Sequence, residues 1–313
     1  MQKVYILSDE FNYSKMITYD AGPLYADQMG WKTSSIKAIA PQVNQINIID
    51  PRITESECYY LETLNLEKIN SIFFFRIVDP YYEQCNNHWY YKFLVKIKDK
   101  QNVYFLSPYQ PEEFTKDLDD ATNNEKLLVI PYAFKTRCHI NSNLKIRKNK
   151  IILSGAIGSL FYPYRQKFLD KVGRNILLRH RIELLEHPGY PDIGQKQRHD
   201  YIGTKYIEHL SRFRFMFVSP SRCSLEFLKY TECAHARCVP VGKAPRSFSL
   251  NQKNTFIELD FNHLFQSTSR LFSIPLSELQ NIAEQYYQVM KVERDPDLLN
   301  SKLDSFIASQ CLL

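Results

Sequence analysis

A short polar turn in the second half of the chain has the composition of a phosphate-binding site. Ser221, Arg222 and Ser224 come directly before a predicted helix from Leu225 to Arg237. Hydroxyl groups, a guanidinium and the free backbone N–H groups at the positive end of a helix all suit a phosphate. These residue types at this spacing therefore predict an anion-binding turn.

A second turn with similar chemistry lies earlier in the sequence. Ser154 and Gly155 follow a predicted strand, Ile151–Leu153, and Arg165 stands in the first turns of the next predicted helix. Glycine lets a backbone come close to a ligand, and the helix end adds positive potential. The spacing is not GxGxxG, so the turn carries no dinucleotide fingerprint. A tight turn with an exposed arginine is the alternative interpretation.

A third candidate segment, residues 186–190, follows the predicted strand Ile182–Leu185. Ligands of open α/β sheets bind at the carboxyl ends of the strands, which is where this segment falls. We therefore expect His187 and Tyr190 to contact the base or the sugar of a ligand. His187 could instead cap a turn.

The elements that must position these residues form two α/β blocks. The pattern of a buried strand, Phe213–Val218, then a polar turn, a helix and a second short strand is the repeating unit of a parallel, doubly wound sheet. The sequence predicts an α/β fold with two Rossmann-like domains facing a cleft, residues 1–140 and 150–313, joined by the polar segment Tyr132–Lys150. The predicted strands are residues 3–7, 46–49, 72–76, 103–106 and 127–130, then 151–153, 182–185 and 213–218, with short ones near 239 and 256. The predicted helices are residues 20–30, 56–69 and 88–98, then one from about 161, and 201–213, 225–237, 275–291 and 297–309.

Two runs of residues resemble those of GT-B glycosyltransferases. The run from Glu232 to Val241 is similar to the pattern Glu-Ala-x-Ala-x-Gly-x-x-Pro-Val of many such enzymes, and Tyr162-Pro163-Tyr164-Arg165 is similar to a loop of bacterial and exostosin-like members. The resemblance implies that Glu232 binds the ribose hydroxyls of a nucleotide-sugar and that Arg165 supports its diphosphate. Arg237 stands where the pattern has glycine, so the exit of this helix must differ.

For function, the resemblance implies the transfer of a sugar, such as a hexosyl or deoxyhexosyl group. The sugar would move from a nucleotide-diphosphate sugar to a saccharide or glycolipid acceptor in glycan biosynthesis. It places the acceptor-binding domain first and the donor-binding domain second. The alternative is a non-catalytic α/β protein that binds a nucleotide or another anionic ligand with the same residues. For the run from Glu232 alone, the alternative is an ordinary α/β unit in which Glu232 makes a surface salt bridge.

A transfer that inverts the sugar needs a base for the acceptor hydroxyl, and first-domain carboxylates are the candidates. Asp20 opens a predicted helix and is the first choice, although Asp is also a common helix N-cap. Asp9 and Glu10, which follow the first strand, are the other candidates.

The sequence predicts no metal and no cofactor. Asp117, Asp119 and Asp120 spell an acidic DxD-like run of the kind that holds a divalent cation, but polar residues flank it and no buried strand precedes it. We interpret it as a solvated loop. Helix ends and arginines would then balance the charge of the diphosphate.

Composition and charge limit the classes of protein to which the chain can belong. The 313 residues are 44% hydrophobic and 24% charged, as in a soluble globular protein, and no apolar run is long enough to span a membrane. The net charge of +6 fits a phosphorylated substrate and also allows peripheral contact with an anionic membrane surface. No nucleic-acid-binding motif accompanies it, and the basic run Lys145–Lys150 reads as solvated surface. Seven cysteines without regular spacing, and no signal peptide, predict a cytoplasmic protein.

Overall fold

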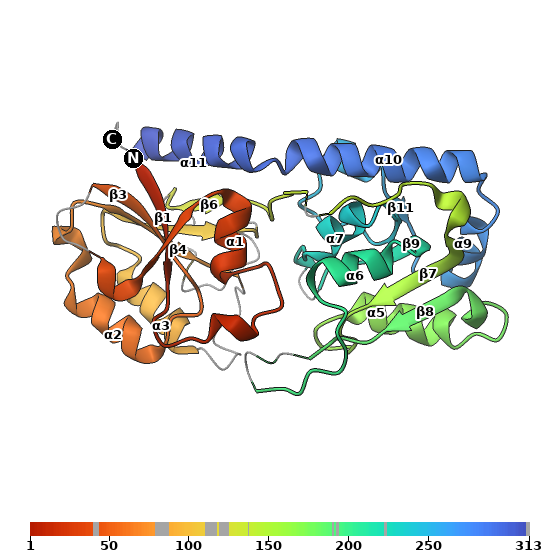
Figure 1. Ribbon diagram of the computed structural model, residues 1–313, viewed down its shortest axis with the longest axis horizontal. Helices are drawn as coiled ribbons and strands as arrows, with labels where there is room; N and C mark the ends of the chain where they lie inside the picture. The colour runs from red at the N-terminus through yellow and green to blue at the C-terminus, as the bar shows by residue number, and fades with distance from the viewer. Residues whose placement is uncertain are drawn as a thin grey trace. The chain divides into compact units, whose positions relative to one another are not determined.

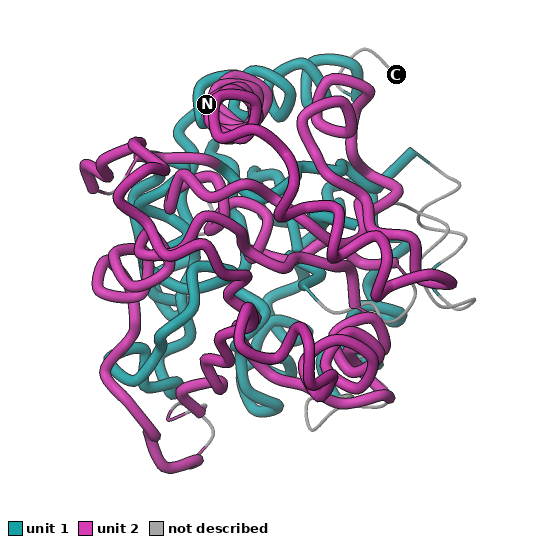
Figure 2. The backbone as a smooth tube through the Cα atoms, turned by 90° about the vertical axis from the view of Figure 1, so that its right-hand side faces the viewer, with its two compact units in different colours: residues 1–133, 296–313 teal, residues 134–295 magenta. Residues whose placement is uncertain are grey.

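The computed structural model describes residues 1–39, 44–78, 88–109, 118, 125–136, 138–189, 191, 194–221 and 224–310. The chain forms two compact units, residues 1–133 with 296–313, and residues 134–295 (Figures 1 and 2). Each unit contains its own parallel sheet with helices packed against it, so the predicted α/β class with two Rossmann-like domains is confirmed.

The first unit is built on a parallel sheet in the order β2-β1-β3-β4-β5-β6. The order reverses between β1 and β3, which is the place where doubly wound sheets bind ligands. Strand β2 was not predicted, because its sequence KTSS is polar and lacks an apolar run. The strands are β1 (Gln2–Leu7), β2 (Lys32–Ser35), β3 (Gln45–Ile49), β4 (Ile72–Arg76), β5 (Val103–Ser107) and β6 (Leu127–Val129).

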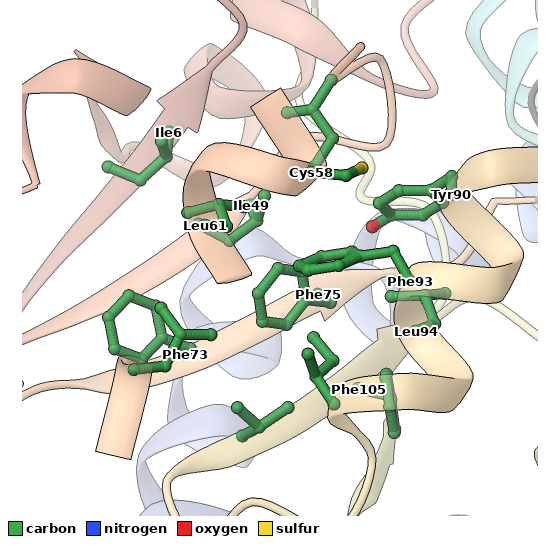
Figure 3. Packing of buried hydrophobic residues seen from close by; sticks show 14 of the residues in the cluster. Ile6, Ile49, Cys58, Leu61, Phe73, Phe75, Tyr90, Phe93, Leu94 and Phe105 are labelled. Atoms are coloured by element: carbon green, nitrogen blue, oxygen red, sulfur yellow. The ribbon is translucent and has the colours of Figure 1, made fainter. Parts of the chain in front are cut away.

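Helices α1 (Gly22–Met29), α2 (Glu55–Thr63) and α3 (His88–Ile97) follow strands of this sheet. Figure 3 shows the core between β4 and the last two of these helices. Buried aromatic rings of β4 and α3 fill it together with aliphatic side chains. The labelled members are Ile6, Ile49, Cys58, Leu61, Phe73, Phe75, Tyr90, Phe93, Leu94 and Phe105.

The last helix, α11 (Pro296–Gln310), belongs to the first unit. Its buried residues Leu299, Leu303 and Ile307 recur every four residues and therefore share one face, which packs in the core around helix α1. The predicted boundaries, 1–140 and 150–313, placed this helix in the second domain. An amphipathic pattern predicts that a helix buries one face, but it does not say which sheet that face covers.

The second unit is built on a parallel sheet in the order β11-β10-β9-β7-β8. Its order reverses between β7 and β9, so the carboxyl ends of these two strands mark the expected ligand position. The strands are β7 (Lys148–Ser154), β8 (Ile182–Leu185), β9 (Phe213–Val218), β10 (Val239–Gly242) and β11 (Ile257–Glu258). The helices are α5 (Pro163–Phe168), α6 (Gly203–Leu210), α7 (Lys229–His235), α8 (Leu250–Asn254), α9 (Leu264–Leu271) and α10 (Leu276–Glu293).

Helix α7 begins four residues later than predicted. Ser224 has a φ of +63°, and the backbone N–H of Ser221 donates to the carbonyl of Leu225 at 3.0 Å. Residues 225–228 therefore form a turn rather than the first turn of a helix. Within it, Glu226 is buried and forms an ion pair with buried Arg294 at 3.0 Å. The predicted helix N-terminus at Ser221–Ser224 is thus wrong.

The exit of α7 explains how the chain does without the expected glycine. Arg237 has a φ of +54°, which is the left-handed conformation that glycine usually supplies at this position. Its guanidinium forms an ion pair with Glu284 at 2.6 Å and lies over the Tyr287 ring, 3.1 Å from the centroid. These two contacts hold a conformation that is strained for a residue with a Cβ atom.

Candidate functional site

The candidate site centres on Lys229, the first residue of α7. Its Nζ donates to Tyr206 Oη at 2.9 Å and lies 2.8 Å from Glu232 Oε2. Tyr206, on α6, is in turn hydrogen-bonded to Ser154 at the end of β7, with 2.6 Å between the two oxygens. The contacts therefore join the end of β7 to the first turn of α7 through an ammonium group.

Gly155 lies against two cations. It has a φ of +97°, and a Cβ atom built on it would meet Arg165 Nη1 at 3.1 Å and Lys229 Cε at 3.2 Å. The side chains of Arg165 and Lys229 thus flank Gly155. The backbone N–H of Gly155 is already used, since it donates to the carbonyl of Leu185 at 3.0 Å, so the two cations are the groups that suit a diphosphate here.

Arg165 is buried on the first turn of α5, and its Nη1 donates to the carbonyl of Ala156 at 3.1 Å. The guanidinium also stacks between the rings of Tyr162 and Phe227, at 4.7 and 5.5 Å from their centroids. Within the described residues, its buried Nε has no hydrogen-bond partner. Burial lowers the pKa of Arg165, but an arginine remains charged. A buried cation with an unused donor favours binding of an anion.

Next to Gly155 lies a cavity of about 490 Å³. Residues 155–157 line it on one side, and His187, Gly189 and Arg198 from the segment after β8 line the other. His187 Nδ1 accepts from the backbone N–H of Gly189 at 3.0 Å, which fixes its orientation. Burial, followed by the positive charges of Lys229 and Arg165, lowers the pKa of His187 to about 4. The imidazole is therefore neutral at pH 7.

The structure brings together most of the predicted donor-site residues. Ser154, Gly155, Arg165, His187 and Glu232 all lie around Lys229 by the contacts above. Ser221 is buried in the turn after β9, and its backbone N–H is already used. Among the described contacts, none joins Ser224 to Lys229. Tyr190 and Arg222 lie outside the described residues.

Two members of the site, Lys229 and Tyr206, were missed by the sequence analysis. Lys229 stands three residues before Glu232, a spacing that places both on one helix face and was available in the sequence. Tyr206 carried no such signal, because it lies on a different helix and meets Lys229 only through the fold.

Three carboxylates of the first unit were candidates for the catalytic base. The carboxylate of Glu10 accepts from Thr54 and Ser56, and these hydroxyls lower its pKa. Asp9 accepts from the backbone N–H of Lys37 at 3.2 Å. Asp20 accepts from Thr18 at 2.6 Å and is not an N-cap, since Ala21 occupies that position of α1 without a side-chain bond. The alternative role for Asp20 as a cap is therefore excluded.

A buried arginine that the sequence analysis did not select supports the Asp20 segment. Arg76, the last residue of β4, donates to the carbonyl of Asp20 at 2.7 Å and to Tyr5 Oη at 3.0 Å. Tyr5 in turn donates to buried Asp50, which also accepts from the backbone N–H of Gly22 at 2.6 Å. This network holds both ends of the turn that carries Asp20.

Within the described ranges, no three His, Cys, Asp or Glu side chains group in a way that could hold a metal ion. Asp117, Asp119 and Asp120 lie outside those ranges. Metal independence therefore stays a prediction. Among the same residues, no helix has the length and apolar character needed to cross a bilayer.

The similarity of this chain to known proteins lies in its fold. No family model and no curated protein sequence matches the chain. Among solved structures, Anabaena Alr3699/HepE in complex with UDP is similar with a TM-score of 0.57 and 9% identity, over 99% of this chain and 100% of HepE. Trehalose-6-phosphate synthase from E. coli, bound with UDP-2-fluoro glucose, gives a TM-score of 0.50 and 14% identity, over 85% of this chain and 73% of the other. Both neighbours are GT-B glycosyltransferases.

The chain has the GT-B fold. The predicted GT-B architecture is confirmed for both units, because the likeness to HepE extends over nearly the whole chain. At these identities the likeness concerns the GT-B fold alone.

Proposed function

We propose that the chain is a glycosyltransferase that moves a sugar from a nucleotide-diphosphate sugar to a saccharide or glycolipid acceptor. The observation that carries the proposal is the position of Gly155 between Arg165 and Lys229, with Glu232 paired to Lys229. The fold supports it, since the similar structures of HepE contain UDP, or UDP and glucose. UDP and UDP-hexoses are therefore the first ligands to test.

In this proposal the donor lies over the carboxyl ends of β7 and β9. The diphosphate lies beside Gly155 and binds the cations of Arg165 and Lys229, and the ribose hydroxyls donate to Glu232. The cavity of about 490 Å³ beside His187 is within the usual size range of small-molecule sites and takes the base. Because Nδ1 accepts from Gly189, the neutral imidazole of His187 carries its proton on Nε2 and can donate a hydrogen bond there.

The proposed reaction exchanges the bond from the sugar to phosphate for a bond to the acceptor oxygen, and it moves the acceptor proton to a base. An acceptor hydroxyl attacks the anomeric carbon, and the bond from that carbon to the terminal phosphate oxygen breaks with its electron pair on the phosphate. Arg165 and Lys229 stabilise the negative charge that develops on the leaving diphosphate. The acceptor proton goes to a base, for which Asp20 is our first choice, ahead of Asp9 and Glu10.

Because Arg165 and Lys229 both offer positive charge to the diphosphate, we propose that transfer proceeds without a metal or another cofactor. We further propose a cytoplasmic location, which the free thiols of the buried cysteines 58, 233 and 238 support.

The experiment is a panel of nucleotide-sugars, each tested first for thermal stabilisation and then for release of nucleoside diphosphate. A bound donor raises the apparent stability through mass action. We expect stabilisation by at least one UDP-sugar and release of UDP in the presence of EDTA. Stabilisation without turnover, over a range of acceptors, would instead support the non-catalytic nucleotide-binding alternative. Turnover that EDTA abolishes and manganese restores would contradict metal independence.

A further inference from the structure

The amino edge of the second sheet carries a surface that the proposed donor site does not use. Strands β7 and β8 pair with Ile151 opposite Ile182, so the loops that lead into them lie at the same edge (Figure 1). These loops are residues 144–147 and 174–181. We call them, together with Lys148 and Lys171, the basic edge.

Large aliphatic side chains project from the basic edge into solvent. Ile146 is 70% exposed, Ile176 73% and Leu177 65%. Their neighbours Leu144 and Leu178 are buried in the core below and anchor the two loops. The exposed side chains are therefore presented by loops with fixed bases.

The same surface is strongly cationic. Residues 144–151 and 169–183 contain eight lysines and arginines and two carboxylates, Asp170 and Glu183. Both carboxylates are ion-paired inside these segments, to Arg174 and to Lys150, each at 3.1 Å. Arg147 is buried and structural, since it donates to the carbonyls of residues 236 and 237. The exposed cationic residues are Lys145, Lys148, Lys171, Arg174 and Arg179.

We propose that the basic edge docks on an anionic lipid surface. Exposed cations close to a membrane are attracted by its negative surface potential, and aliphatic side chains beside them enter the boundary between headgroups and acyl chains. The occupant must be negatively charged and must accept isolated aliphatic groups over a broad face, and a bilayer rich in anionic lipid has both properties. This inference is independent of the proposed transferase activity.

The experiment is sedimentation of the full chain with vesicles of phosphatidylcholine, and with vesicles that also contain phosphatidylglycerol. We expect binding to the anionic vesicles alone, and weaker binding as sodium chloride is added, because salt screens exposed charges. Absence of binding to either vesicle would overturn the proposal and leave a protein partner as the occupant. Equal binding to both would overturn the role of charge.

Amino-acid substitutions test whether the basic edge is the surface that binds the vesicles. Replacing both Ile176→Asp and Leu177→Asp, or Arg179→Glu alone, should lower vesicle partitioning by about tenfold or more. The matched controls lie on α8, where Leu250 is 74% exposed and Lys253 is also exposed. Leu250→Asp and Lys253→Glu should leave partitioning unchanged. Circular dichroism of each variant confirms folding, and equal losses in the test and control variants would overturn the assignment.

Discussion

Lys229 and Glu232 lie three residues apart on helix α7, with 2.8 Å between Nζ and Oε2. Their side chains are 19% and 17% exposed, so this is a largely buried pair and not a surface salt bridge. Burial lowers the pKa of Lys229, but Glu232 and Tyr206 raise it more, and the ammonium stays charged. With Arg165 nearby, the described part of the site holds more positive than negative charge before any donor binds.

Lys229→Gln should weaken UDP binding by about 10- to 150-fold, which corresponds to ~1.5–3 kcal/mol for a hydrogen bond to a charged group. The physical reason is the loss of one of two cations that face the diphosphate. Isothermal titration calorimetry measures the change, and Lys253→Gln on α8 is the control. Unchanged affinity in a folded Lys229→Gln protein would remove Lys229 from the site.

The Glu232→Gln variant tests the ribose contact through the difference in affinity between UDP and 2′-deoxy-UDP. The wild-type protein should bind UDP more tightly than 2′-deoxy-UDP, because a hydrogen bond from a hydroxyl to a carboxylate contributes about 1.5–3 kcal/mol. In the variant the difference between the two ligands should shrink, as a double-mutant cycle measures directly. The same discrimination in both proteins would show that Glu232 does not contact the 2′-hydroxyl.

Gly155→Ala should lower both stability and UDP affinity. At a φ of +97° any Cβ is strained, and here it would also press on Arg165 and Lys229. Gly30 is the matched control, with a φ of +70° and open space where its Cβ would lie. Gly30→Ala should therefore lower the melting temperature without changing the Kd for UDP. Equal Kd values for the two variants would contradict a ligand at Gly155.

Part of this site could be predicted from sequence, and the missing part has physical causes. Apart from the polar strand β2, the strands and the glycine turn after β7 were predictable from apolar runs bounded by polar turns, and Glu232 from its resemblance to a known pattern. The start of α7 was not, because Leu225–Leu228 are good helix formers and the turn there depends on Ser224 and on the buried ion pair of Glu226 with Arg294. Tyr206 and Arg76 reach their partners through tertiary packing, which no local pattern records.

His187 should make stability depend on pH below neutrality. Its pKa is about 4 in the folded protein, below the ordinary value of about 6.5 in the unfolded chain. Between these values the unfolded chain binds more protons, so stability should fall as the pH drops from about 6.5 to about 4. His187→Gln should flatten the slope in urea unfolding curves.

The imidazole signal in an NMR titration gives a second reading of His187. In the free protein it should not titrate above about pH 5, and with UDP bound its pKa should rise because a nearby anion favours the protonated form. A free-protein pKa near 6.5 would contradict the positive potential assigned to this site.

Asp20→Asn should lower kcat by roughly 10²- to 10⁴-fold and leave the Kd for UDP unchanged, because a general base acts in the transition state and does not contact the donor. Asp9→Asn and Glu10→Gln are the comparison variants, and we expect smaller effects from them. Near-normal kcat in all three would mean that the proton leaves by another route, such as to the departing phosphate.

The central claim is tested most directly by a crystal structure with UDP bound. We predict that diphosphate oxygens lie within hydrogen-bonding distance of Arg165 and Lys229 beside Gly155, and that a ribose hydroxyl donates to Glu232. A diphosphate bound elsewhere, or a ribose that does not touch Glu232, would contradict the proposed donor site.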